Sequence, residues 1–377
     1  MEFLKVYNKI DFEPVKAQGA YVWDKNGEKY LDFYGGHAVI SIGHRHPLWV
    51  QYLKEQIDQI PFYSNAVQKG IEDKFARLLG EVSGYNDYGF FACNSGAEAV
   101  ENALKLASFH TGKDKVLAFS KAFHGRTSAA VSVSDYPNNV APLNKYHKVV
   151  FSPLNDTAKA VEIIEQSDLA AVIVEGIQGV GGVHIPTKEF LSEVKKACDK
   201  NGTLLILDEV QSGYGRSGKF FAHQHAGVKA DLIPVAKGMG NGFPMGGVLV
   251  SPEVEYKTGQ LGSTFGGNHM ALAAGIAVLE VIQSEKLIEN AALLGAYLID
   301  ELSQINAVSE VRGQGLMIAL ELPEDNFKEV KNNLLFAQKL LTGQSGKNIL
   351  RLLPPLNITK TQADQAVQAI QKAINSL

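Results

Sequence analysis

Short apolar runs alternate with longer amphipathic stretches through the middle of the 377-residue chain. Residues 170–174, 203–207 and 232–236 are largely apolar runs of strand length. Between the first two, residues 188–201 place apolar side chains on one helical face and end at Gly202. Continuous apolar strands that alternate with helices predict an α/β fold, with a mostly parallel sheet covered by helices on both faces.

The two ends of the chain show a different, α+β pattern. Residues 21–30 are typical of a hairpin with an Asn-Gly turn, and residues 312–321 of a strand that follows a turn. A final helix is expected after Thr361, which we predict as its cap. We therefore predict a large domain flanked by a smaller α+β domain that both termini build. The predicted boundaries are 47–282 for the large domain, and 1–46 with 283–377 for the small domain.

Composition narrows the class of protein. A net charge of -4 argues against a nucleic-acid-binding surface, which favours a basic excess. The two cysteines cannot form a disulfide framework. Residues 1–14 lack the apolar core of a signal peptide, and no apolar run reaches the roughly 18 residues that span a bilayer. We expect a soluble, cytoplasmic protein that binds neither nucleic acid nor membrane.

Two kinds of motif resemble ligand sites but lack features that such sites need. Residues 213–218 match G-x-G-x-x-G, yet the helix that a dinucleotide site requires does not follow, and Phe220 stands where a P-loop needs Ser or Thr. The pairs His44/His46 and His223/His225 have no evident third ligand, so core or turn positions are expected and no metal site is predicted.

Polar residues recur where the predicted parallel strands end, which is where ligands bind in such sheets. These residues are Glu175, Asp208 and Lys237. A buried Asp208 requires a cationic partner, and a protonated heteroaromatic nitrogen meets that need. Lys237 lies among apolar residues and glycines, where desolvation lowers a lysine's pKa as imine chemistry requires.

Residues 94–99, Asn-Ser-Gly-Ala-Glu-Ala, precede a helical stretch. Small residues at a helix start leave backbone N–H groups open to an anion, although an ordinary Ser-capped helix explains the same pattern. Phe123 is an aromatic candidate for stacking on a ring. An anion site, a buried Asp and a buried Lys together match the needs of pyridoxal phosphate.

These residues carry a resemblance. The chain resembles the class III aminotransferases, which are fold-type I pyridoxal-phosphate enzymes, and within them the acetylornithine and succinylornithine aminotransferases. The likeness runs nearly end to end. It rests on six segments in order: residues 94–99, 123–126, 207–211, 236–238, 263–268 and 351–356.

The resemblance implies a role for each matching residue. Lys237 is expected to be the catalytic lysine that binds pyridoxal phosphate covalently. The expected cofactor-binding residues are Ser95, Gly96, Ala97, Phe123, Asp208, Val210, Gln211 and Thr264. Among them, Asp208 would pair with the ring nitrogen, Gln211 would bond the phenolic oxygen, and Phe123 and Val210 would cover the two ring faces.

The resemblance also implies a homodimer in which Thr264 reaches the cofactor phosphate of the other subunit. Ser263 is expected near the substrate, and Arg126 and Arg351 are expected to bind substrate carboxylates. The arginines have independent support, because the chain has only six arginines among its 36 basic residues and a guanidinium fork binds a carboxylate well.

Two departures from the family pattern concern the substrate. Residues 175–182 have Val180 where the family has a second Glu, so Arg351 would lack an acidic partner from this loop. Near the N-terminus, His37 and Ile40 replace the family's Ile and Asn. Both changes are expected near the acyl end of the substrate. The sequence is therefore compatible with an acetyl and with a succinyl substrate.

The sequence therefore predicts an N-acylornithine:2-oxoglutarate aminotransferase of arginine biosynthesis, with a ping-pong reaction between the aldehyde and amine forms of the cofactor. The alternatives are an ornithine, 4-aminobutyrate or lysine aminotransferase, a glutamate-semialdehyde-type aminomutase, and a cofactor-binding scaffold without activity.

Overall fold

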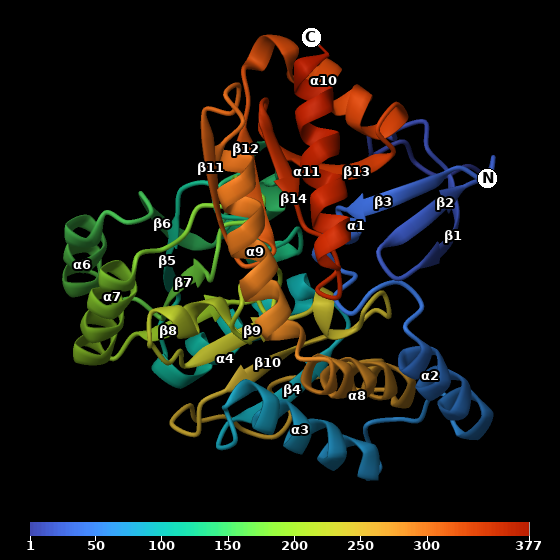
Figure 1. Cartoon of the computed structure of the whole chain (residues 1–377). Helices are drawn as coiled ribbons and strands as arrows, with labels where there is room; N and C mark the ends of the chain where they lie inside the picture. The colour runs from blue at the N-terminus through green and yellow to red at the C-terminus, as the bar shows by residue number, and fades with distance from the viewer. Residues whose placement is uncertain (377) are drawn as a thin grey trace.

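A computed structural model describes residues 1–376, which form two seven-stranded sheets (Figure 1). The larger body contains the sheet β4-β10-β9-β8-β7-β5-β6, in which only β10 runs against its neighbours. This confirms the predicted mostly parallel sheet. Its strands are β4 (Gly89–Cys93), β5 (Lys115–Phe119), β6 (Lys148–Ser152), β7 (Ala171–Glu175), β8 (Leu204–Asp208), β9 (Leu232–Val235) and β10 (Gly246–Val250).

Helices cover both faces of this sheet. Along β8, Leu204 and Ile206 pack toward α4 (Gly96–Thr111), whereas Leu205 and Leu207 pack into the other core cluster, toward α7 (Lys188–Asn201). Both faces are apolar, which explains why the strand sequences do not alternate. The remaining helices of this part are α2 (Pro47–Gln59), α3 (Gly70–Ser83), α5 (Ser128–Ser132), α6 (Thr157–Gln166) and α8 (His269–Ser284).

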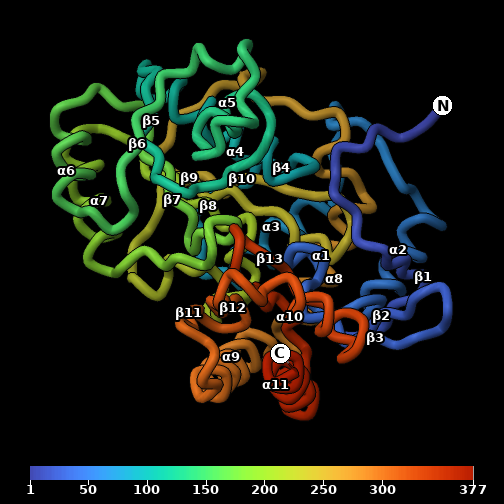
Figure 2. The backbone as a smooth tube through the Cα atoms, turned by 90° about the horizontal axis from the view of Figure 1, so that it is seen from above, coloured from blue at the N-terminus to red at the C-terminus, as the bar shows by residue number. Residues whose placement is uncertain are grey.

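The other sheet combines the two ends of the chain, in the order β1-β2-β3-β13-β14-β12-β11. Its one parallel pair joins β3 to β13, and the others are antiparallel. The strands are β1 (Pro14–Gln18), β2 (Tyr21–Asp24), β3 (Lys29–Phe33), β11 (Glu310–Gln314), β12 (Met317–Glu321), β13 (Leu340–Ser345) and β14 (Ile349–Leu352). The helices packed on this sheet are α9 (Leu287–Ser303), α10 (Glu324–Phe336) and α11 (Lys360–Asn375). Figure 2 shows α9 and α11 side by side at the bottom of the view.

The predicted hairpin over residues 21–30 is confirmed as β2 and β3, with Gly27 in the left-handed region at φ 85°. The predicted cap of the last helix is wrong by two residues. Thr359 is the cap, because its hydroxyl accepts from the Gln362 amide while the Gln362 side chain accepts from the Thr359 amide. The predicted domain boundaries stay a prediction, and residue 283 falls inside α8.

The G-x-G-x-x-G segment packs against α9 and the turn between β11 and β12. A Cβ on Gly218 would lie 2.9 Å from Ala292 Cβ in α9, and one on Gly315 would lie 2.4 Å from the carbonyl carbon of Ser217. No α-helix opens at these glycines, since only a short 3₁₀ helix, Ala222–His225, follows. Gly218 and Gly315 therefore allow this segment to pack closely against α9 and against the turn between β11 and β12.

Three of the four histidines in the paired motifs bond to carboxylates, His44 to Asp32, His46 to Glu285 and His223 to Glu209. Within residues 1–376, no three His, Cys, Asp or Glu side chains cluster in a way that suits a metal ion. In the same range, no helix combines the length and apolarity needed to cross a membrane.

Candidate active site

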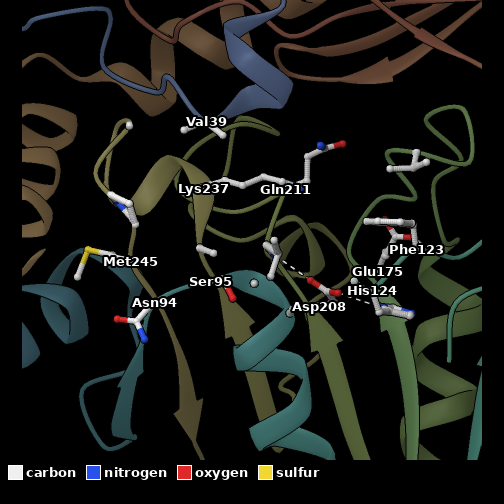
Figure 3. Close-up of a pocket in the computed structure, with 18 of the residues that line it drawn as sticks. Val39, Asn94, Ser95, Phe123, His124, Glu175, Asp208, Gln211, Lys237 and Met245 are labelled. Atoms are coloured by element: carbon white, nitrogen blue, oxygen red, sulfur yellow. Dashed lines mark hydrogen bonds and ion pairs between the residues drawn. The ribbon is translucent and has the colours of Figure 1, made fainter. Parts of the chain in front are cut away.

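The carboxyl edge of the large sheet brings together the three polar residues expected there. Glu175 and Asp208 are the last residues of β7 and β8 and face each other in register. Lys237 follows β9 and begins a 3₁₀ turn in the left-handed region, at φ 48°. All three line one cavity of about 350 Å³ (Figure 3). The parallel topology thus brings residues that are far apart in the sequence together in one site.

The cavity gathers most of the residues predicted to bind the cofactor. They come from the start of α4, from the loop after β5, and from the ends of β8 and β9. The predicted residues that line it are Ser95, Gly96, Ala97, Phe123, Asp208, Val210, Gln211 and Lys237.

The start of α4 forms the floor of the cavity. The Ser95 hydroxyl accepts the Glu98 amide at 3.2 Å, so the serine caps the helix as the simpler interpretation predicted. The amides of Gly96 and Ala97 lie in the first turn, where an α-helix offers no internal acceptor. A Cβ on Gly96 would come within 2.6 Å of Val210 Cγ1, so only glycine allows this contact. A capped helix start with free amides suits an anion such as a phosphate.

Asp208 is buried and bound to His124, a residue for which the sequence predicted no role. Its Oδ2 lies 2.7 Å from His124 Nδ1, and its Oδ1 accepts the Val210 amide at 2.9 Å. His124 Nε2 is buried without a hydrogen-bond partner in the described part of the chain. His124 follows Phe123 in the recognised motif, but no spacing pointed to Asp208, which lies 84 residues away. The pair fixes the carboxylate's direction into the cavity.

Glu175 is the other buried carboxylate at this edge. It accepts the Phe123 amide at 2.9 Å and the Gly179 amide at 3.1 Å. Burial raises the pKa of Glu175 to about 7. Glu175 therefore holds together the two loops that carry Phe123 and Val180, both of which line the cavity.

Lys237 extends across the cavity above Asp208 (Figure 3). Burial lowers the pKa of Lys237 to about 8, against the opposing charges of Asp208 and Glu175. A usable fraction of the amine is therefore uncharged near neutral pH, which a nucleophilic or proton-transferring lysine needs.

This pKa predicts how stability depends on pH. In the cofactor-free protein, Lys237 loses its proton near pH 8 when folded but near 10.5 when unfolded. The unfolded state binds more protons between these values, so stability rises with pH across that window. We expect Lys237→Met to be more stable than the wild type by about 3 kcal/mol near pH 7. The difference should shrink as the pH approaches 10.5. Urea unfolding of both apoproteins across this range measures it, and a difference that ignores pH would contradict the lowered pKa.

The side-chain amide of Gln211 has only one of its two polar atoms in a hydrogen bond. Its Nε2 donates to the His37 carbonyl at 3.2 Å, whereas its Oε1 is buried and has no partner among residues 1–376. A Cβ on Gly179 would overlap this oxygen, so the amide lies directly against the Gly179 backbone. An unpaired buried amide oxygen at the cavity wall is a position that a bound molecule can satisfy.

Arg351 lies in β14, buried beside the cavity. Its Nη1 donates to the Gly179 carbonyl at 2.9 Å and its Nε to the Gln344 carbonyl at 3.2 Å. The side chain on the Gly179 loop that lines the cavity is Val180, which has no acidic group. Burial lowers the pKa of Arg351. A buried guanidinium held only by carbonyls retains donors for an anionic ligand.

Besides Arg351, three predicted residues lie outside the cavity lining. Arg126 is exposed, with its guanidinium carbon 5.9 Å from the centroid of the Phe123 ring. Ser263 Oγ accepts from the side chain of Asn94, which does line the cavity. Thr264 is exposed and makes no contact with the cavity of its own chain.

The segment that contains His37, one of the two departures from the family pattern near the N-terminus, has unusual backbone geometry. Gly35 to Ala38, labelled α1, are all left-handed, with φ between 55° and 66°. The Tyr34 hydroxyl lies 2.5 Å from His37 Nε2. Burial, followed by the charges of Arg351 and Lys237, lowers the pKa of His37 to about 4. His37 therefore presents a neutral imidazole beside the cationic groups of the site.

Comparison with known proteins identifies the class. The sequence profile described as "Aminotransferase class-III" matches residues 5–374. The chain belongs to this family, whose members are pyridoxal-phosphate-dependent transaminases. The predicted family, cofactor and fold type are confirmed.

Several relatives within this family are similar to the chain over nearly its whole length. The chain is 39% identical to acetylornithine aminotransferase of Bacillus subtilis (strain 168), covering 98% of this chain and 97% of the relative. It is 40% identical to acetylornithine aminotransferase of Methanosarcina mazei, over 98% and 93% of the two chains. Among solved structures, acetylornithine aminotransferase from Elizabethkingia anophelis matches with a TM-score of 0.87 at 31% identity, covering 99% of this chain and 96% of the other. Ornithine aminotransferase from Toxoplasma gondii matches with a TM-score of 0.92 at 30% identity, covering 99% and 92%.

The residues present fit pyridoxal phosphate. The open amides at the start of α4 suit its phosphate, and the buried Asp208 carboxylate suits a protonated ring nitrogen. The orphaned Gln211 oxygen gives a further polar contact, and Lys237 supplies the amine. A structure of the Toxoplasma gondii ornithine aminotransferase is described with this cofactor at its active site.

Proposed function

We propose that this chain is an N-acylornithine:2-oxoglutarate aminotransferase of arginine biosynthesis, with N-acetylornithine as the leading substrate. One observation carries the chemistry: Lys237, Asp208 and the amides that begin α4 converge on one cavity. The acyl substrate is supported by the relatives, several of which are named acetylornithine aminotransferases. The predicted cytoplasmic location stays a prediction.

We assign the cofactor contacts as follows. Gly96 and Ala97 donate their amides to the phosphate, with Ser95 beside them. Phe123 and Val210 would cover the two faces of the ring, and Gln211 would bond the phenolic oxygen. Asp208, oriented by His124 at 2.7 Å, keeps the ring nitrogen protonated. Pyridoxal phosphate supplies the aldehyde and the electron-withdrawing ring that no side chain provides.

Lys237 is assigned two tasks in this proposal. It would hold the cofactor, and it would move a proton at the substrate's δ-carbon, first as base and then as acid. The pKa of about 8 places this lysine near the pH at which such transfers are most efficient. Acylation of the α-amine removes its positive charge, so only the δ-amine can react.

The two arginines are assigned to the substrate carboxylates. Arg351 is the fixed one, because the Gly179 and Gln344 carbonyls hold its guanidinium in place. Arg126 is exposed in the isolated chain and lies over the ring of Phe123, which lines the cavity. Ser263 is assigned to the substrate's vicinity through its bond to Asn94.

The homodimer forms part of the proposal. Thr264 is exposed and does not line its own chain's cavity, as expected of a residue that serves the other subunit. Beside it, Phe62 and Phe265 are 40% and 60% exposed, with ring centroids 5.5 Å apart. An exposed aromatic pair next to this loop supports a second copy of the chain as the occupant of this face.

A substrate panel tests the proposal. Purified protein with 2-oxoglutarate is offered N-acetylornithine, N-succinylornithine, ornithine, 4-aminobutyrate and lysine, and glutamate formation is measured. We expect an acylornithine to give the highest kcat/KM, and the better of the two identifies the acyl group. Preference for an unacylated amine would overturn the substrate assignment. Conversion of glutamate semialdehyde without 2-oxoglutarate would indicate the aminomutase.

The substitution Val180→Glu tests whether Arg351 is freely available. A carboxylate at this position would face the guanidinium and compete with substrate anions. We expect KM for 2-oxoglutarate to rise about tenfold, an effect of about 1.4 kcal/mol. Val180→Gln has the same size without the charge and serves as the control. Equal effects of Glu and Gln would mean that bulk, not charge, is responsible.

A further inference from the structure

A buried lysine lies outside the cavity, just before α3. The Lys69 side chain is only 1% exposed. Its Nζ donates to Asn65 Oδ1 at 2.5 Å, to the Gly267 carbonyl at 2.9 Å and to Glu72 Oε1 at 2.8 Å. An ammonium group has three hydrogens, so every one is used. Burying a lysine is costly unless its charge is fully satisfied, which gives this arrangement a fixed geometry.

Asn65 extends this geometry to the loop that carries Thr264. Its amide oxygen is held by Lys69, and its Nδ2 donates to the Ser263 carbonyl at 2.8 Å and the Gly266 carbonyl at 3.0 Å. The two carbonyls flank Thr264 on either side. Lys69 and Asn65 thus fix the main chain of residues 263–267 through three carbonyl groups.

The other side of the same loop is fixed to the cavity. Ser263 Oγ accepts from Asn94 Nδ2 at 3.1 Å and from the Gly266 amide at 2.9 Å. Asn94 lines the cavity, and its side-chain and backbone N–H groups both donate to Glu98 in the first turn of α4. The loop is therefore held between the start of α3 and the start of α4, with Thr264 projecting from it.

We propose that Lys69, acting through Asn65 and Gly267, is a positioning residue that fixes loop 263–267 so that Thr264 reaches the cofactor phosphate of the partner subunit. This inference rests on the proposed function, which places Thr264 at the partner's cofactor. Its consequence is directional: a change at Lys69 speeds cofactor release from the other subunit's site and not from its own.

Hybrid dimers with two affinity tags test this direction. Lys237→Ala on one subunit leaves a single site with the visible band of lysine-bound cofactor. In the trans hybrid, Lys69→Met is placed on the Lys237→Ala subunit. In the cis hybrid, it is placed on the subunit with intact Lys237. The readout is the rate at which cofactor leaves the intact site, followed by loss of the visible band.

We expect cofactor release to be about tenfold faster in the trans hybrid than in the reference hybrid without Lys69→Met, as for a lost charge-assisted contact. The cis hybrid should match the reference. Lys74→Met, in the first turns of α3 and partly exposed beside Glu280, should change neither hybrid. If Lys69→Met fails to fold, Asn65→Ala, which changes an exposed side chain, takes its place.

Equal effects in both hybrids, an effect in cis alone, or no effect at all would overturn the proposal, as would failure to form hybrid dimers. The substrate panel on the wild type tests the proposed function separately, so failure of the Lys69 proposal can be distinguished from failure of the proposed function. Release of the cofactor does not depend on which amine the enzyme uses.

Discussion

Lys237→Ala should abolish turnover, with a fall in kcat of at least about 10⁴-fold. The cavity offers no second lysine: Lys237 is the one that lines it within residues 1–376. The substitution removes both the amine that binds the cofactor and the base that moves the substrate proton. Steady-state transamination and the visible absorbance of the loaded protein measure the two losses separately.

The matched control is Lys331→Ala. Burial lowers the pKa of Lys331 to about 8 as well, but this lysine lies on α10 and donates to Gln344 outside the cavity. We expect Lys331→Ala to keep its visible band and its kcat within about twofold, since Lys331 does not line the cavity. Activity retained in Lys237→Ala would contradict the assignment of the catalytic residue.

Asp208→Asn should lower kcat by about 10³-fold, the effect of losing one preorganised electrostatic contact to developing charge. Asparagine keeps the size of the side chain, so the change is chiefly one of charge. An amide cannot hold the ring nitrogen in its protonated form as the buried carboxylate does. The single-turnover rate with an acylornithine measures this directly, because it isolates proton removal from product release.

Asp231→Asn is the control for a general loss of a buried carboxylate. Asp231 is also buried, accepts the Leu205 amide at 2.7 Å and pairs with Lys195, yet it does not line the cavity. We expect this variant to lose stability and keep its single-turnover rate. A comparable loss of rate in both variants would show that the Asp208 effect comes from folding.

The sequence predicted the parts of the fold that rest on local patterns. Residues 188–201 match α7 because an apolar stripe and Gly202 define both its face and its end. The apolar runs that end at Glu175 and Asp208 match β7 and β8, and their topology brings the polar residues together. The cap of the last helix was missed, because Thr359 and Thr361 both fit the pattern and only Thr359 forms the capping box.

Long-range contacts in the site had no signal in the sequence. His124 and Asp208 are 84 residues apart, and Arg351 is 172 residues from the Gly179 carbonyl that holds it. Such pairs follow from the register of two sheets, which local periodicity does not specify. The buried state of Lys69 was equally invisible, because a single lysine before a helix is ordinarily a surface residue.

The central claim is that Lys237 and its cavity transfer an amino group from an acylornithine to 2-oxoglutarate. The most direct measurement is the visible absorbance of the cofactor-loaded protein during two successive additions. We expect N-acetylornithine or N-succinylornithine to bleach the band and 2-oxoglutarate to restore it, with no response in Lys237→Ala. A band that stays unchanged with both acylornithines but bleaches with ornithine would contradict the substrate, and a protein that forms no band would contradict the site itself.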